Sequence, residues 1–202
     1  MMTKSNIWSN LVSMEDNRKT FDTIQLLNFL TEDIISFAAQ KLGQDFPDYI
    51  DMNCGAIPQG EYEKIIDPDS PEQFLMLYKT TALKRLNLAA STLLKSDEAF
   101  MKPLEDYFLR QGKRLKADLP WPENLRQALE LFDLCILCSC EGRVIIEETE
   151  QVVKWNYQDS RDADGLYWKL MEFFMQGIFS DSPFCFCLRD GLIFEIMIKK
   201  AS

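Results

Sequence analysis

The sequence predicts an α+β protein that is predominantly helical: a helical N-terminal two-thirds packed with a small antiparallel sheet that includes a C-terminal hairpin at about 184–198. Before residue 135, apolar residues recur at three- and four-residue spacing, the pattern of helices with one buried face. Near the C-terminus, Asp190-Gly191 separates two apolar runs, the usual signal of a β-hairpin. The 202 residues include only eight Gly and eight Pro, so the chain has no low-complexity character. We therefore expect a single domain over residues 1–202, with a long acidic connection at about 43–69.

The first helix is predicted over residues 20–42, where apolar residues form one continuous stripe. Thr20 suits the cap at its start, and Gly43 suits its end. The connection that follows, to about residue 69, is punctuated by Pro and Gly, so no element is predicted there.

A second helix is predicted to begin after Ser70 and to run to about Lys95. Pro71 suits the first helical position, and Gln73 is spaced from Ser70 as in a capping box. An apolar stripe then continues without interruption.

Three further helices are predicted downstream. One begins near residue 96, is kinked or opened by Pro103, and has a weak point at Gly112. The next opens at Pro122, after a rigid break in the chain. The last spans 163–179 and has a clear apolar face.

Residues 133–157 are ambiguous between helix and strand. The β-branched run Val144-Ile145-Ile146 favours a strand by propensity. The acidic run from Glu147 to Glu150 fits either a helix face or a hairpin loop. Both assignments stay open at this stage.

The C-terminal hairpin has a predicted register and an unusual pattern. A two-residue loop at Asp190-Gly191 pairs Leu188 with Ile193, and both faces of the hairpin are then apolar. An isolated hairpin is barely stable, so we expect it to join strands from about 133–156. The helices would cover one face, and either a homodimer through this hairpin or the helices of residues 20–94 would cover the other.

The charge of the chain favours one kind of partner. The net charge is −10, and residues 43–73 alone carry eight acids against Lys64. A negative surface of this kind suits a basic partner and opposes direct binding to nucleic acid, which needs a basic face.

The pattern is typical of a small cytosolic interaction protein: an inhibitor, an immunity-type protein or a chaperone that uses an acidic surface to bind a basic protein partner. We expect a binding protein rather than an enzyme, and no catalytic residue is predicted. The candidate partner-binding residues lie in two acidic segments; they are Asp67, Asp69, Glu147, Glu148 and Glu150.

The chain contains no histidine, which removes several chemistries. Ser-His-Asp and Cys-His nucleophile pairs are excluded, as are the usual zinc hydrolase ligand sets. The common glycine-rich nucleotide-binding loops are absent too. The enzyme alternative is a carboxylate-based enzyme or small-ligand-binding protein with a helical pocket, which predicts a deep pocket with two or more carboxylates of raised pKa.

The cysteines give a second alternative, a Cys-ligated metal module. Its four thiolates would converge if the two Cys-x-Cys pairs lay on neighbouring strands; they are Cys138, Cys140, Cys185 and Cys187. Buried structural thiols are the favoured interpretation, because Phe184 and Phe186 resemble core residues and not a metal knuckle. No cofactor and no metal are expected.

The N-terminus and the hydropathy of the chain suggest its cellular location. No apolar stretch that resembles a secretion signal follows Met1, and no run approaches the roughly 18 apolar residues of a membrane span. We therefore expect a cytoplasmic protein with reduced thiols and no membrane partner.

Overall fold

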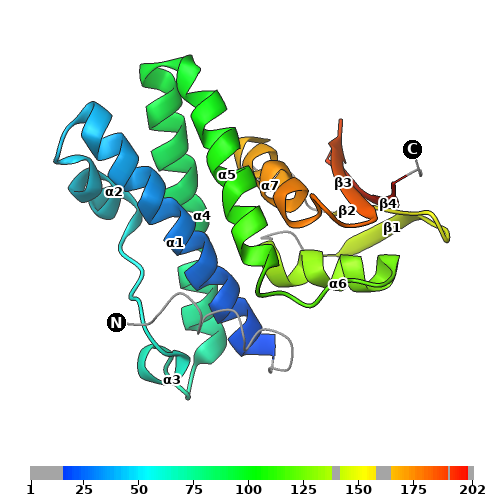
Figure 1. Cartoon of the computed structure of the whole chain (residues 1–202). Helices are drawn as coiled ribbons and strands as arrows, with labels where there is room; N and C mark the ends of the chain where they lie inside the picture. Colours follow the sequence, from blue (N-terminus) through cyan, green and yellow to red (C-terminus); the bar gives the residue numbers. More distant parts are fainter. Residues whose placement is uncertain (1–15, 138–141, 158–164, 191, 200–202) are drawn as a thin grey trace. The chain divides into compact units, whose positions relative to one another are not determined.

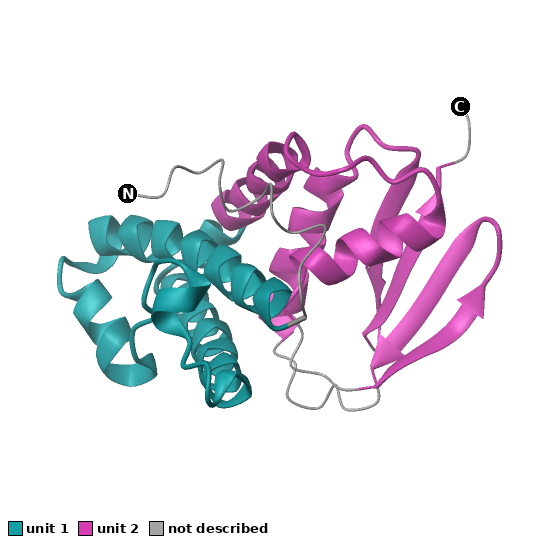
Figure 2. Cartoon of the chain, turned by 90° about the horizontal axis from the view of Figure 1, so that it is seen from below, with its two compact units in different colours: residues 1–101 teal, residues 102–202 magenta. Residues whose placement is uncertain are grey.

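The computed structural model describes residues 16–137, 142–157, 165–190 and 192–199 (Figure 1). The described chain is α+β and predominantly helical, with helices α1 to α7 and one antiparallel sheet of order β1-β2-β4-β3. The predicted fold class is confirmed. The chain divides into two compact units, Met1–Met101 and Lys102–Ser202, shown in separate colours in Figure 2.

Unit 1 is built on two long helices, α1 (Asp16–Leu42) and α4 (Pro71–Ser96), which pack along each other. The short helices α2 (Phe46–Cys54) and α3 (Tyr62–Ile65) lie between them in sequence, and the 3-10 turn η1 (Glu98–Phe100) follows α4. The connection predicted as irregular therefore contains two helices. Two of its Pro and Gly residues mark the ends of α2, since Pro47 lies in the first turn of that helix and Gly55 is its C-cap.

Two helix caps predicted in unit 1 need correction. The first helix begins at Asp16, so Thr20 lies inside it and is not its cap. Ser70 does occupy the N-cap position of α4, but its side chain makes no capping hydrogen bond. Instead, the amide of Gln73 donates to the carbonyl oxygen of Ser70 at 3.2 Å, so the capping box is not formed.

Arg85 of α4 joins three helices of unit 1. Its side chain is 4% exposed and donates to Glu32 Oε1 of α1 at 2.6 Å. It also donates to Asp51 Oδ1 of α2 and to the carbonyl oxygen of Gly55. These hydrogen bonds pair both terminal nitrogens of the buried guanidinium, although its Nε has no partner among the described residues, and they fix α2 against the α1–α4 pair.

Unit 2 contains α5 (Met101–Lys116), α6 (Leu125–Cys135) and α7 (Gly165–Ile178) together with the sheet. The strands are β1 (Arg143–Glu148), β2 (Val152–Tyr157), β3 (Phe184–Arg189) and β4 (Ile193–Ile198). The helix predicted from Pro122 starts later, because Asn124 is the N-cap and its side chain accepts from the amide of Gln127 at 2.9 Å. The ambiguity over 133–157 is resolved for the described residues: α6 ends at Cys135, and β1 and β2 form a hairpin that extends the C-terminal one, while 138–141 lie outside the described residues.

The core of unit 2 is an aromatic cluster between one face of the sheet and two helices. Phe132 of α6 meets Trp155 of β2 at 5.0 Å between ring centroids, and Trp168 of α7 meets Phe194 of β4 at 4.7 Å. Figure 1 shows α6 and α7 beside the sheet. Because side chains alternate along a strand, this first face of the sheet carries the large rings and the second face carries the residues between them.

The register of the C-terminal hairpin differs from the predicted one by one residue. Arg189 pairs with Ile193 and Leu188 with Phe194, so the loop spans three residues and not two. Leu192, the last of them, has a φ of 56°, the left-handed conformation that a three-residue loop requires. The shift reverses every side chain of β4 relative to β3, and Phe194 shares a face with Phe186 and not with Cys187.

In the part of the chain that the structure describes, no helix is both long enough and apolar enough to cross a membrane.

Candidate protein-binding surface

The edge strand β1 carries an exposed apolar run. The sheet order places β1 at one end, and among the described residues no strand pairs with its outer side. Val144, Ile145 and Ile146 are 37%, 42% and 51% exposed. Adjacent residues of a strand point to opposite faces, so three exposed neighbours mean that both sides of this edge are uncovered. Exposed apolar edge strands are typical sites of association.

A β-bulge shapes this edge. The pairing of β1 with β2 shifts between Ile145 and Glu147, which leaves Ile146 as the extra residue. Bulges bend a strand, and on sheet edges they oppose uncontrolled pairing with further strands. The surface is therefore suited to contacts through side chains.

Three of the predicted partner-binding residues lie next to this apolar run. Glu147 pairs with Lys154 of β2 at 2.7 Å, so its charge is largely neutralised. Glu148 ends β1, and Glu150 lies in the β1–β2 turn; both are exposed, and neither has an ion-pair partner among the described residues. The turn is held by Thr149, whose hydroxyl accepts from the amides of Gln151 and Val152 at 3.2 and 3.1 Å.

We define the β1 surface as Val144, Ile145, Ile146, Glu148 and Glu150. The sequence predicts its carboxylates and favours a strand for the apolar run. Its exposure was missed, because a run of β-branched residues is equally typical of a buried strand. The sequence does hold one indication of this exposure, because several acidic residues directly follow the apolar run.

Asp67 and Asp69 lie in unit 1, between α3 and α4, and are exposed. Asp67 Oδ1 accepts a hydrogen bond from the amide of Asp69 at 2.9 Å, which stabilises the turn before α4. The structure therefore gives Asp67 a local structural role.

The second face of the sheet carries a line of alternating charges. Glu195 of β4 forms ion pairs with Arg189 at 2.9 Å and with Lys154 at 3.5 Å. Lys154 also pairs with Glu147. This arrangement places one charged residue on each of the four strands. It explains how Glu195 is tolerated with only 6% exposure.

The residues of the predicted metal module are only partly described. Cys138 and Cys140 lie outside the described residues. Cys185 and Cys187 lie half-buried on β3, on the second face of the sheet. Among the residues that are described, no group of three or more His, Cys, Asp or Glu side chains is placed to hold a metal ion.

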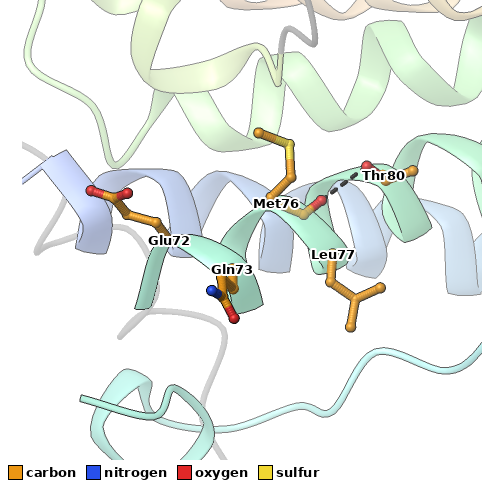
Figure 3. A pocket seen from close by; sticks show the side chains of 5 residues that line it. All are labelled: Glu72, Gln73, Met76, Leu77 and Thr80. Atoms are coloured by element: carbon orange, nitrogen blue, oxygen red, sulfur yellow. Dashed lines mark hydrogen bonds between the residues drawn. The ribbon is translucent and has the colours of Figure 1, made fainter. Parts of the chain in front are cut away.

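Unit 1 has a separate exposed apolar site at the start of α4. Met76 and Leu77 are 60% and 59% exposed, and with Glu72, Gln73 and Thr80 they line a shallow, open hollow (Figure 3). The hydroxyl of Thr80 donates to the carbonyl oxygen of Met76 at 2.9 Å. All five residues come from one helix, and Glu72 is the single carboxylate among them, so the hollow is not the deep acidic pocket that the enzyme alternative predicts.

No family model, no curated protein and no solved structure matches this chain significantly.

Proposed function

We propose that this protein is an interaction protein that binds a basic protein partner through the β1 surface. One observation carries the proposal: an exposed apolar run on an edge strand adjoins two exposed carboxylates, Glu148 and Glu150, which have no ion-pair partner in the part of the chain that the structure describes. The apolar side chains supply area that is buried on binding, and the carboxylates favour a basic partner and accelerate its approach.

The acidity of the whole chain supports this choice of partner. A net charge of −10 repels acidic proteins and nucleic acid at long range and attracts basic proteins. Inhibitors, immunity-type proteins and chaperones that sequester a basic protein in the cytoplasm have this character, and we place the protein in that class.

The test has two steps, identification of the partner and measurement of its affinity. Native mass spectrometry of the protein purified gently from its host would identify a co-purifying basic protein. The dissociation constant for that purified partner is then measured against salt concentration. Replacing Glu148 and Glu150 by Lys should weaken binding and flatten its salt dependence.

A matched control is Asp118→Lys with Glu123→Lys, which changes the net charge equally at exposed positions of the same unit. We expect this control to weaken binding much less. Equal loss in both double variants would show that only net charge matters and would contradict a role for the β1 surface.

A homodimer remains the competing use of the sheet. The sequence suggested dimerisation through the C-terminal hairpin, whose outer strand is β3. On that strand the amide of Leu188 already donates to Glu172 Oε1 of α7 at 3.0 Å, so one edge donor is engaged. Light scattering that shows a dimer abolished by Ile146→Ser would assign the β1 surface to a second copy and not to a basic partner.

A further inference from the structure

The second face of the sheet is more exposed than the first in the described part of the chain. Along β2 the side chains of the first face are buried, and those of the second face are half-buried. Besides the line of charges, the second face carries half-buried apolar and thiol side chains: Val152, Cys185, Cys187, Ile193 and Met197. The solvated face of an antiparallel sheet is normally polar, so we expect this face to be covered by another molecule.

The line of charges has spare bonding capacity at its two ends. Its central members, Lys154 and Glu195, are paired on both sides. Its outer members, Glu147 and Arg189, are paired on one side only, and their side chains are 42% and 59% exposed. Glu147 is bonded through Oε2 and Arg189 through Nε, so Oε1 and the two terminal guanidinium nitrogens have no hydrogen-bond partner among the described residues. Both ends of the line can therefore bind groups of another molecule.

We propose that the second face binds a second copy of this chain, related to the first by a two-fold axis that lies between the two sheets and runs parallel to their strands. In sheet order the charges alternate: negative on β1, positive on β2, negative on β4 and positive on β3. Rotation about this axis reverses the sheet order, so each charge faces an opposite charge. Glu147 then faces Arg189 of the second copy, and the converse contact forms at the other end. Lys154 likewise faces Glu195 of the second copy.

Other occupants and orientations match this line less well. A two-fold axis across the strands would place every charge over its own counterpart and create like-charge contacts along the whole line. A uniformly basic or acidic partner would match only half of an alternating line. The axis along the strands also keeps the two strand directions aligned, which is a common geometry of packed sheets, and it sets Val152 against Met197 of the second copy.

The contact specifies the homodimer that the sequence suggests, because it assigns the dimer to a face and not to the edge of the hairpin. This inference goes beyond the proposed function and does not depend on it. The register directs Glu148 to the first face, and Glu150 lies in the β1–β2 turn. The carboxylates of the β1 surface therefore lie outside the dimer contact.

The test is sedimentation velocity of the full-length protein. The wild type should sediment as a dimer of twice the 23.5 kDa chain mass. Glu147→Arg and Arg189→Glu each place like charges at both ends of the line, so each should raise the dimer dissociation constant by about 100-fold.

An equimolar mixture of Glu147→Arg and Arg189→Glu should form a mixed dimer. In that dimer the introduced Arg faces the introduced Glu, and the native Glu147 of one chain faces the native Arg189 of the other. A loss of folding in either variant could not produce this recovery. A monomeric wild type, a dimer that persists in both single variants, or a mixture that stays monomeric would overturn the proposal.

Glu148→Arg is the matched control, since it makes the same charge change one residue away on the first face. It should leave the dimer intact. A loss of dimer equal to that of Glu147→Arg would place the contact at the β1 edge and overturn the assignment to the second face.

A second measurement locates the covered face. Cys185 and Cys187 should be alkylated more slowly in the wild-type dimer than in monomeric Glu147→Arg, as read by peptide mass spectrometry. Cys54, which lies in the other unit, should react equally in both. Equal rates at Cys185 and Cys187 in dimer and monomer would show that the dimer forms through another surface.

Discussion

Gly112 of α5 and Gly177 of α7 lie backbone to backbone where the two helices meet in unit 2. A Cβ atom at Gly177 would lie 3.1 Å from Gly112 Cα and 2.3 Å from the carbonyl oxygen of Leu109. A Cβ atom at Gly112 would lie 2.0 Å from the carbonyl oxygen of Phe174. Only glycine on both helices allows this approach, since a backbone cannot yield as a flexible side chain does.

Alanine at either glycine should therefore destabilise the protein. We expect Gly112→Ala or Gly177→Ala to lower the free energy of unfolding by about 3 kcal/mol, at the upper end of overpacking costs, because backbone must shift. Gly165→Ala is the matched control, since nothing lies within 4 Å of its added Cβ. Chemical denaturation measures all three; equal values for Gly112→Ala and Gly165→Ala would refute the close contact.

Arg85 should be needed for the stability of unit 1. Replacement by Met removes hydrogen bonds to Glu32, Asp51 and the carbonyl of Gly55. The two carboxylate side chains are 39% and 49% exposed and regain water, so we expect a moderate loss of about 2 kcal/mol. The neighbouring exposed Lys84→Met should change stability by less than about 0.5 kcal/mol. A similar effect of both substitutions in thermal unfolding would show that the guanidinium contacts contribute little.

Asp22 should make stability depend on pH. Burial raises the pKa of this carboxyl from 3.8 to about 6, with Arg18 lowering it and Glu63 raising it further. The folded state therefore holds a proton that the unfolded state has released, and stability falls as pH rises from about 4 through 6.

Asp22→Asn removes this contribution. Relative to the wild type, the variant should gain stability as pH rises from about 4 to 7, by about 1 kcal/mol after discounting for partial exposure. Urea denaturation across that pH range is the measurement. A constant difference between variant and wild type would show that Asp22 titrates normally.

The exposure of the β1 edge predicts that Ile146 tolerates polar substitution. Ile146→Thr keeps the β-branched shape at a half-exposed position and should change stability by about 0.5 kcal/mol or less. Ile196→Thr, at a fully buried position of β4, should cost about 3 kcal/mol because it buries a hydroxyl. If Ile146→Thr destabilised unit 2 as strongly as Ile196→Thr, Ile146 would be a core residue and not part of a binding surface.

Thiol reactivity should separate the cysteines. Cys135 is buried, and burial raises its pKa to about 12. It should resist alkylation in the native protein and react only after unfolding, whereas the half-buried Cys185 and Cys187 should react slowly without denaturant. Rapid native labelling of Cys135 would show that the end of α6 opens readily.

Much of the fold was predictable because its signals are local. The apolar stripe of α4, the stop at Gly43 and the apolar runs around Asp190-Gly191 each reflect the periodicity of a single element. These patterns gave the mainly helical α+β class and the two strands of the hairpin. Helix caps were predicted less accurately, since Thr20 lies inside α1 and the Ser70 side chain makes no capping hydrogen bond; caps compete with backbone hydrogen bonds that the sequence does not reveal.

The sequence by itself determined the long helices and the C-terminal hairpin, the absence of histidine chemistry and the acidity of the chain. Tertiary structure alone decided the rest, because each remaining feature depends on neighbours distant in sequence. The register of β4 depends on the left-handed Leu192 and on the pairing of Glu195 with Lys154. Gly112, a weak point by helix propensity, is required by the approach of α7. Val144 to Ile146 are exposed because the strand order leaves β1 at the edge, and no local pattern distinguishes an edge strand from a central one.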